Sequence, residues 1–515
     1  MRAVALACYT RLHLTVQSTI PMVTSTPVPT LPKRNRLAVV VCLLIVLLLA
    51  LGLWLRSAVR SALPQLDGTV AVAGLSAPVT VTRDPHGVPT IQAANLDDLF
   101  FAQGYVTAQD RLFQMDGTRR FAAGELSEVV GPTQLEHDRQ QRILGLRVAA
   151  RKTIETSSAE DRLHFAAYAQ GVNAFIESHR DRLPIEFRIL RYYPKPWTSE
   201  DSALIGAYMI EELSTSPRHT LTREKILAKL GAELTADLYV NSSWRDRFPT
   251  VPHPSLEQEK PPTVQQPMAA DDAMSSPAPN PLAFTVADVA AEFPHERFFD
   301  DPPLAVGSNN WVVSGAHSVT GKPLLSNDMH LGHQMPNLWY AAHLRCGDLD
   351  VAGVTLPGYP YVVVGHNQHV AWGFTNLGPT VEDVYVETFN AAGEYLTPGG
   401  WQQPEHRREV IHVKGKLDDV IDVVLTRHGP IVTDLVPGET RKLALRWTLY
   451  DGVRNPFFAV NSARNWDDFL HAFAQFDAPG QNVVYADVDG NIGYHATGKI
   501  PIRASGGSMP SILRW

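Results

Sequence analysis

A change in composition near residue 307 constrains the fold more than any other feature of this chain. Residues 248–307 are rich in proline and poor in aromatic residues, so they bury too little apolar surface to form a core. Directly after them, Gly307-Ser308 opens an alternating run of polar and apolar residues, which predicts a strand. Composition alone favours an interdomain linker for 248–307. Its end immediately before a strand raises the alternative of an excised spacer.

The two sides of this boundary differ in predicted secondary structure. Residues 79–91 read as a hairpin, and a helix is expected after Asn95, an N-cap followed by Asp97 and Asp98 in the first turn. Further helical patterns cover 136–180, 199–213 and 220–239. The strands predicted after the boundary are 308–313, 323–326, 361–364, 370–374, 381–387, 420–427 and 442–449, followed by a helix at 465–476 and a hairpin at 483–495. The fold class is therefore α+β.

The N-terminus predicts a membrane segment. Residues 1–36 form a basic tail without acidic residues, of the kind that stays disordered, and residues 37–55 contain no charge over nearly the length that crosses a bilayer. More basic residues precede this transmembrane helix, or signal anchor, than follow it, which places the bulk of the chain outside the cytoplasm. A long cleavable signal peptide is the alternative. Both interpretations predict a membrane-anchored or secreted protein that faces the periplasm or the cell exterior.

Charge and cysteine content exclude several classes of protein. The net charge of −8 and the absence of a basic stripe argue against a nucleic-acid partner and favour a small-molecule substrate. Of the three cysteines, Cys8 lies in the basic tail and Cys42 in the apolar run. Cys346 is therefore alone in the remainder, which excludes a disulfide framework or a thiolate metal site there.

Ser308 is the most prominent residue for chemistry. The chain contains no Gly-x-Ser-x-Gly elbow, no His-Glu-x-x-His motif and no phosphate-binding glycine loop. A serine hydroxyl needs a base, and a free N-terminal amine, with a pKa of about 7.7 to 8.0, can serve if the chain is cut just before Ser308. Gly307 suits such a cut because a residue without Cβ lets the peptide adopt strained geometry. Taken alone, however, the Gly-Ser dipeptide is more typical of an ordinary turn.

A set of separated motifs removes that ambiguity. They are Arg83-Asp84-Pro85-His86-Gly87-Val88-Pro89, Ala102-Gln103-Gly104-Tyr105, Gln109-Asp110-Arg111-Leu112-Phe113-Gln114-Met115, Gly124-Glu125-Leu126, Gly307-Ser308-Asn309-Asn310-Trp311-Val312-Val313, Ser326-Asn327-Asp328-Met329-His330, Gly365-His366-Asn367, Trp372-Gly373-Phe374-Thr375-Asn376 and Ala486-Asp487-Val488-Asp489-Gly490-Asn491-Ile492-Gly493-Tyr494. In this order, from about Leu66 to Trp515, the chain resembles the penicillin acylase family of N-terminal nucleophile hydrolases.

The resemblance implies a precursor that folds as a four-layer αββα sandwich. It would comprise an α segment (63–247), an excised spacer peptide (248–307) and a β segment (308–515), and the α and β segments would remain associated after cleavage. Cleavage between Gly307 and Ser308 would be autocatalytic.

The resemblance also assigns catalytic roles. Ser308 would attack an amide carbonyl of an N-acyl compound, with its own amine carrying the proton, and an acyl-serine intermediate would then be hydrolysed. The matching position for a backbone N–H that stabilises the oxyanion is Asn376. His330 occupies the place of a residue that helps to orient the amine and the substrate amide. No cofactor is implied for the chemistry.

Substrate and metal residues follow from the same resemblance. The acyl-pocket positions correspond to Met209, Leu213, Leu331 and Phe374, where leucines replace two rings of phenylacetyl-selective relatives; an aliphatic or differently shaped acyl group would then fit better. Ordinary core packing is the alternative interpretation. A structural calcium is implied at Glu382 and Asp383, although no acidic partner aligns at Ser216 or its neighbours. The alternative is a solvated acidic pair.

The chain departs from the family pattern after its last motif. The family's β segment is longer and carries an asparagine that completes the oxyanion hole, with an arginine beyond it; neither is present before Trp515. This predicts an incomplete reading frame or one piece of a split protein. The rival to an active amidase is therefore a catalytically inactive, membrane-tethered remnant or binding module. A third interpretation keeps the enzyme but makes acyl-homoserine lactones its substrates.

Overall fold

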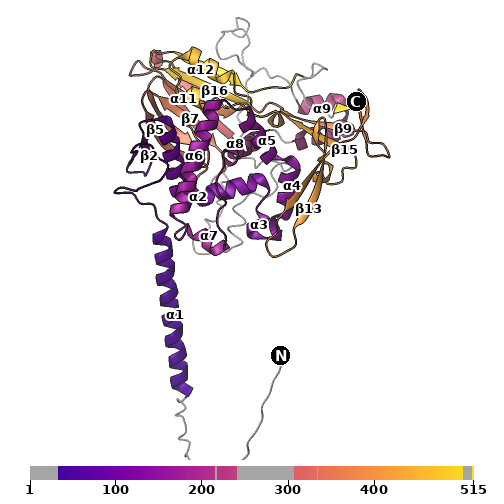
Figure 1. Cartoon of the computed structure of the whole chain (residues 1–515). Coiled ribbons are helices and arrows are strands. Elements are labelled where there is room, and N and C mark those ends of the chain that lie inside the picture. Colours follow the sequence, from indigo (N-terminus) through magenta and orange to yellow (C-terminus); the bar gives the residue numbers. More distant parts are fainter. Residues whose placement is uncertain (1–32, 215–216, 240–306, 333, 503–512, 515) are drawn as a thin grey trace, which may run out of the picture. The chain divides into compact units, whose positions relative to one another are not determined.

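The computed structural model describes residues 33–214, 217–239, 307–332, 334–502 and 513–514 (Figure 1). The chain divides into two units, residues 1–61 and 62–515. In the first unit, helix α1 (Lys33–Ser61) contains the predicted apolar segment and continues beyond residue 55. Its portion from Leu37 to Ser61 is long and apolar enough to cross a membrane. The predicted basic tail and the spacer peptide lie almost entirely outside the described residues.

The second unit is built on an eight-stranded sheet that joins both halves of the chain. Its strand order is β1-β2-β5-β6-β7-β8-β16-β17, and β2 pairs with β5 in parallel although they come from opposite sides of the composition break. The strands are β1 (Thr80–Arg83), β2 (Pro89–Gln92), β5 (Tyr340–Cys346), β6 (Leu349–Thr355), β7 (Val364–Asn367), β8 (Val370–Asn376), β16 (Gln481–Asp487) and β17 (Ile492–Thr497). The two halves therefore share one sheet.

Most helices of the second unit come from residues 96–238. As predicted, Asn95 caps α2, and its side chain accepts a 2.8 Å hydrogen bond from the Asp98 backbone N–H. Helices α2 and α6 pack unusually closely, because a Cβ at Gly104 would lie 2.1 Å from the Tyr168 carbonyl oxygen. The helices are α2 (Leu96–Ala123), α3 (Ser127–Val130), α4 (Leu135–Leu144), α5 (Leu146–Thr156), α6 (Ala159–Ser178), α7 (Ile185–Leu190), α8 (Ser199–Leu213), α9 (Pro217–Leu238), α11 (Phe457–Asn461) and α12 (Trp466–Phe473).

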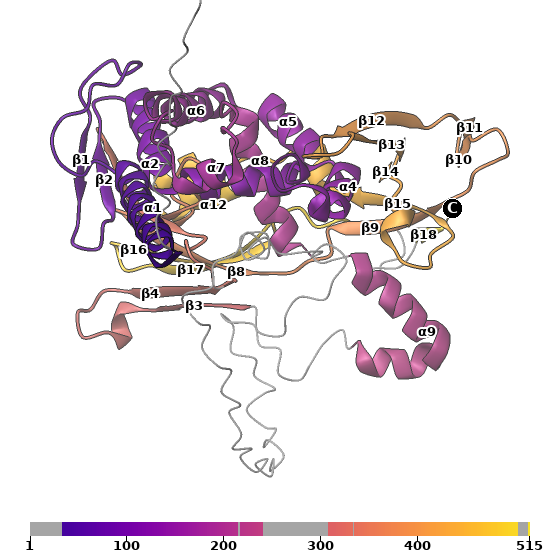
Figure 2. The ribbon, with the colours of Figure 1, turned by 90° about the horizontal axis from the view of Figure 1, so that it is seen from below.

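Helices and a hairpin cover opposite faces of the sheet. Figure 2 shows α2, α6 and α8 along one face and the hairpin of β3 (Gly307–Val313) and β4 (Leu324–His330) along the other. The Asn327 side chain attaches the hairpin to the sheet, because its Nδ2 donates to the Phe374 carbonyl at 2.7 Å and its Oδ1 accepts from the Phe374 N–H at 2.8 Å. The described residues thus contain a helix layer, a sheet and a hairpin layer.

Smaller sheets extend the second unit beyond the eight-stranded sheet. They group β12-β13-β14, β15-β9-β18 and β10-β11. Their strands are β9 (Glu382–Glu387), β10 (Tyr395–Thr397), β11 (Gly400–Gln402), β12 (Glu405–Ile411), β13 (Asp419–Thr426), β14 (Gly429–Pro430), β15 (Lys442–Trp447) and β18 (Leu513–Arg514).

Two predicted elements are wrong in detail. The predicted strand at 361–364 is a loop up to Val363, because Tyr361 has φ of 79° and its hydroxyl is directed into a helix contact, 3.0 Å from His164 Nδ1. The helical pattern at 136–180 is three helices, broken at Gly145, which adopts the left-handed conformation, and at Ser157. The sequence analysis also did not predict β5, β6, β10, β11 and β12. The predicted strands at 308–313, 370–374 and 381–387 are confirmed.

Candidate active site

Ser308 lies on β3, at the start of the hairpin that covers the sheet. In the antiparallel register Ser308 is opposite Met329, so both side chains point to the same face of the hairpin. That face is directed toward β8, where Asn310 Nδ2 donates to the Gly373 carbonyl at 3.3 Å and the Asn482 carbonyl at 3.2 Å. The alternation of this strand therefore directs the Ser308 hydroxyl toward the sheet.

The Ser308 side chain lies beside the Gly307 carbonyl group. The Ser308 hydroxyl donates to the Gly307 carbonyl oxygen at 2.7 Å. Gly307 has no positive φ, and a Cβ built there would meet nothing within 4 Å. The folded backbone therefore does not itself require glycine at this position. The role of Gly307 in cleavage stays a prediction.

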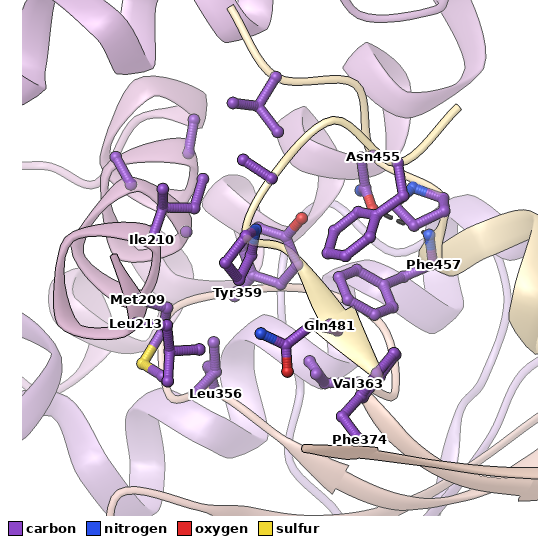
Figure 3. A pocket seen from close by; sticks show the side chains of 18 of the residues that line it. Met209, Ile210, Leu213, Leu356, Tyr359, Val363, Phe374, Asn455, Phe457 and Gln481 are labelled. Carbon is purple, nitrogen blue, oxygen red and sulfur yellow. Dashed lines mark hydrogen bonds between the residues drawn. The ribbon is translucent and has the colours of Figure 1, made fainter. Parts of the chain in front are cut away.

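Ser308 lines a cavity of about 110 Å³, whose other lining residues come from the helices, the eight-stranded sheet and the loops beside them. Figure 3 shows part of this lining, including Met209 and Phe374. The four residues predicted for the acyl pocket, Met209, Leu213, Leu331 and Phe374, all line this cavity. Its walls are mainly apolar. Other residues that line it and that the sequence did not single out are Trp339, Leu356, Tyr359, Val363, Asn455, Phe457 and Gln481.

Aromatic rings hold the far wall of the cavity together. Phe374 and Phe457 are 6.3 Å apart between ring centroids, and Tyr359 is equally far from Phe457, each pair with its ring planes perpendicular. Edge-to-face pairs of this kind add to the stability that burial of the rings provides. Because these rings interlock, we expect the cavity to keep its shape.

Asn376 lies at the same cavity and connects the α and β segments. Its Nδ2 donates to the Leu213 carbonyl of α8 at 2.9 Å, and its Oδ1 accepts from Gln481 Nε2 at 3.1 Å. Asn482 Nδ2 contacts the Asn376 carbonyl at 3.3 Å. Hydrogen bonds to α8 and to β16 thus fix the end of β8. A backbone N–H that stabilises an oxyanion has to be held in this way.

His330 is outside the cavity. It is opposite Gly307 in the register, so its side chain points to the other face of the hairpin from Ser308. Its Nε2 is 2.8 Å from Asp328 Oδ2 on the exposed side. The structure therefore places His330 beside the Gly307–Ser308 peptide rather than among the residues that line this cavity.

The carboxylates expected to bind calcium lie at the start of β9. Glu382 is buried, and neither of its carboxylate oxygens has a hydrogen-bond partner among the described residues. Burial, followed by the nearby carboxylates of Glu211 and Asp383, raises the pKa of Glu382 well above its usual value. Burial also raises the pKa of Glu211, at the end of α8, to about 8. Glu211 is thus an acidic neighbour on the α side that the sequence did not identify.

Carboxylate oxygens are the type of ligand that calcium prefers, but these side chains supply fewer oxygens than calcium takes. Calcium takes six to eight oxygen ligands, including carbonyls and water as well as carboxylates. Throughout the described part of the chain, no group of three or more His, Cys, Asp or Glu side chains is arranged to hold a metal ion. A calcium ion at Glu382 and Asp383 would therefore need further oxygen ligands, and it stays a prediction.

The sequence matches a known protein family over most of its length. The model of the penicillin amidase family matches residues 78–512, and the chain belongs to this family. It is 33% identical over 453 residues to penicillin acylase 2 proenzyme of Pseudomonas sp. strain SE83, covering 87% of this chain and 56% of that protein.

Two other relatives show how far the similarity extends. The acyl-homoserine lactone acylase QuiP of Pseudomonas aeruginosa is 30% identical over 476 residues, which is 89% of this chain and 54% of QuiP. Penicillin G acylase of Escherichia coli is 30% identical over 468 residues, which is 84% of this chain and 55% of that enzyme. The chain spans about half the length of the curated relatives that it matches.

Proposed function

We propose that this chain carries the nucleophile of an amide hydrolase for N-acyl compounds. One observation supports it most: Ser308, the first residue of the β segment, lies on the same cavity as Asn376 and all four predicted acyl-pocket residues. In the proposed reaction Ser308 Oγ attacks the amide carbonyl, the amine product leaves, and water hydrolyses the acyl-serine ester. The backbone N–H of Asn376 stabilises the oxyanion in both steps.

The proposed base is the α-amine of Ser308, freed by autocatalytic cleavage after Gly307. His330 lies opposite Gly307 and would therefore face this amine rather than the acyl group. We assign to it the orientation of the amine. The hydrogen bond from the Ser308 hydroxyl to the Gly307 carbonyl places the hydroxyl beside the bond to be cut.

The α and β segments are proposed to stay together after cleavage. Supporting this, β2 and β5 share a sheet, and Arg139 contacts Asp419 at 2.8 Å while Arg142 contacts Glu409 at 3.0 Å. The apolar part of α1 is proposed to anchor the protein to a membrane, with the hydrolase outside the cytoplasm.

The proposed acyl group is aliphatic. Leu213 and Leu331 offer flexible apolar contacts where phenylacetyl-selective relatives carry rings, and the polar groups at the cavity are few. Acyl-homoserine lactones are a second candidate substrate, favoured because several relatives, including QuiP, carry that activity in their names. Both candidates require the same attack by Ser308 on an amide.

Hydrolysis of matched amides tests the proposal. Hexanoyl, octanoyl and phenylacetyl p-nitroanilides and the corresponding homoserine lactones would be compared for release of product. We expect the aliphatic amides to react faster than the phenylacetyl amide, and Ser308→Ala to abolish all turnover. The matched control is Ser318→Ala, in the connection between β3 and β4, where the hydroxyl donates to the Lys322 carbonyl at 2.6 Å and does not line the cavity. Turnover that survives in Ser308→Ala would refute the proposal, and its complete absence in the wild-type protein would favour the inactive remnant.

A further inference from the structure

A second cavity, of about 460 Å³, shares no lining residue with the cavity at Ser308. Helix α2 contributes residues between Gln109 and Phe121, and the connection before β5 contributes Gln334 to Leu338. The rest of the lining comes from the segment after α1 and from α7 and α8. Its volume lies in the range of pockets that hold small molecules. The hydrolysis proposed at Ser308 does not use this cavity.

Most of the lining of the second cavity is apolar, and part of it is open to solvent. Phe121 on α2 and Tyr208 on α8 form an edge-to-face pair with 5.6 Å between ring centroids. Met335 and Leu63 also line the cavity, although they are 83% and 63% exposed. Exposed apolar side chains around a hollow are stabilised when a ligand covers them. The cavity therefore favours a ligand with an apolar portion.

Arg111 lines this cavity without a carboxylate partner. It is half-buried on α2, and no Asp or Glu among the described residues forms an ion pair with it. Its neighbour Asp110 pairs instead with Arg83 at 2.8 Å and accepts from the Tyr340 hydroxyl at 2.6 Å. Burial lowers the pKa of the Arg111 guanidinium below its usual value, because removal from water disfavours the charged form. The charge of Arg111 is thus only partly compensated.

The hydrogen bonds of Arg111 leave one edge of its guanidinium free. Nη1 donates to Gln114 Oε1 and to the Asn337 carbonyl, each at 3.1 Å. In the part of the chain that the structure describes, Nε and Nη2 have no partner, and both keep some accessible surface. Nε and Nη2 together form the edge through which arginine binds a carboxylate or a phosphate with two parallel hydrogen bonds.

Glu186 is a second charged residue on the lining, and it lies on α7. An anionic group in the cavity is repelled by this carboxylate and attracted by Arg111. The two residues thus orient a ligand that has one charged end. The charge lies at the α2 side, beside Arg111, and the apolar portion covers the remaining lining.

We propose that this cavity binds an anionic amphiphile, a molecule with one carboxylate or phosphate group on an alkyl chain. The anionic group accepts from Nε and Nη2 of Arg111, and the alkyl chain covers Phe121, Tyr208 and Met335. This site is separate from the proposed hydrolysis, so binding is measured without turnover.

Two sources of such a molecule fit the position of the site in the sequence. Ala62, Leu63 and Pro64 line the cavity and directly follow α1, the helix proposed to lie in a membrane. An anionic lipid of that membrane is one source, and a soluble alkyl acid is the other. Both present the same chemistry to Arg111.

Matched probes test the charged end and the chain separately. The full chain would be held in phosphatidylcholine nanodiscs, and heats of binding would be corrected with empty discs. Decyl phosphate should bind at least about 10-fold more tightly than decanol, decyltrimethylammonium or inorganic phosphate, because only decyl phosphate satisfies both Arg111 and the apolar lining. Equal affinities for decyl phosphate and decanol would overturn the proposal.

Variants assign the binding to this cavity. Arg111→Leu should weaken decyl phosphate binding about 10- to 100-fold, because charge-assisted hydrogen bonds are lost, and should leave decanol binding unchanged. Thr118→Phe fills the cavity from α2 and keeps Arg111, so it should weaken both probes. It decides the question if Arg111→Leu does not fold. Wild-type affinity for decyl phosphate in Thr118→Phe would contradict the assignment.

Two controls separate this site from other effects. Arg188→Leu removes an arginine of α7 that does not line the cavity, and it should bind decyl phosphate as the wild-type protein does. Ser308→Ala should also bind it normally, because Ser308 belongs to the other cavity. Loss of binding in Ser308→Ala would show that decyl phosphate occupies that cavity instead, and would overturn the proposal.

A photoreactive diazirine at the end of the alkyl chain locates the site. Labelled peptides from 109–121 or 334–338 would support the proposal, and labels confined to α1 or to the Ser308 cavity would overturn it. Discs of phosphatidylglycerol then distinguish the two sources. If this lipid weakens decyl phosphate binding in the wild-type protein more than in Arg111→Leu, the membrane lipid occupies the site. An equal change in both proteins identifies the soluble alkyl acid.

Discussion

The buried carboxylate of Asp116 and the buried carboxylates of Glu211 and Glu382 are neutralised in different ways. Asp116 on α2 is fully buried and accepts from Arg119 at 2.6 Å, Arg120 at 2.9 Å and the Tyr192 hydroxyl at 2.8 Å. Burial acts to raise its pKa, but the two arginines outweigh this and hold the pKa of Asp116 below its usual value. This carboxylate is therefore charged and fully paired.

In the part of the chain that the structure describes, no basic side chain pairs with Glu382 or Glu211. Glu382 has no hydrogen-bond partner among the described residues, and Glu211 keeps one buried oxygen unpaired. Their pKa values are raised by burial, so a proton replaces the missing arginine. The comparison shows that the buried carboxylate of Asp116 stays charged because two arginines of the same chain pair with it. Near β9 we expect a proton to neutralise the buried carboxylates, and the calcium ion stays a prediction.

The largest expected effect comes from breaking the paired group. Asp116→Ala leaves Arg119 and Arg120 buried without their shared carboxylate, which should destabilise the protein by about 3 to 5 kcal/mol. Urea denaturation would measure this. The matched control is Asp348→Ala, which removes a 3.0 Å ion pair with Arg464 at the surface and should cost at most about 1 kcal/mol. Equal losses in the two variants would contradict the distinction.

An effect that is smaller for each pH unit is expected from Glu211 and Glu382, because it is spread over a range of pH. The pKa of Glu211 is about 8 in the folded protein, against about 4.3 in an unfolded chain. The folded state therefore holds its proton more tightly, and stability present below pH 4.3 is lost as the pH rises toward 8. Each pH unit in this window costs up to about 1.4 kcal/mol.

Glu211→Gln isolates this effect, because the amide cannot ionise. In EDTA, urea midpoints between pH 5 and pH 8 should fall steeply for the wild-type protein and more gently for Glu211→Gln. Glu186→Gln, in a helix outside this group, serves as the control and should keep the wild-type slope. Parallel curves for wild type and Glu211→Gln would show that this carboxylate is not protonated in the folded state.

The smallest effect expected is that of calcium. If the ion takes the place of the proton, millimolar calcium should raise the melting temperature by a few degrees at pH 8 and by less at pH 5, where the carboxylates are protonated. Magnesium, which prefers strict octahedral geometry, should have little effect. Glu382→Gln together with Asp383→Asn should remove the response. A shift that is independent of pH would point to a site elsewhere.

The sequence predicted the strand that carries Ser308 and the residues around it. It did not predict which partners the buried polar groups would find. The Asn95 cap and the strand at Ser308 follow from local patterns, and the acyl-pocket residues follow from family motifs. The sequence predicts a strand over 361–364, whereas in the folded chain the Tyr361 hydroxyl contacts His164 on α6 and Tyr361 lies in a loop. Long-range contacts of this kind leave no local signal.

The same limit applies to the site. Glu211 and Glu382 are far apart in the sequence, and nothing near either residue indicates the other. A residue's neighbours in sequence predict its element, but its unsatisfied hydrogen bonds are a property of the tertiary structure.

The most direct test of the central claim is the identity of the new N-terminus in the purified protein. Mass spectrometry of the wild-type protein should give two polypeptides, one of which begins at Ser308, and chemical modification of its free amine should abolish hydrolysis. Ser308→Ala should give a single uncut chain. A wild-type chain that hydrolyses N-acyl amides while the Gly307–Ser308 peptide remains intact would contradict the account.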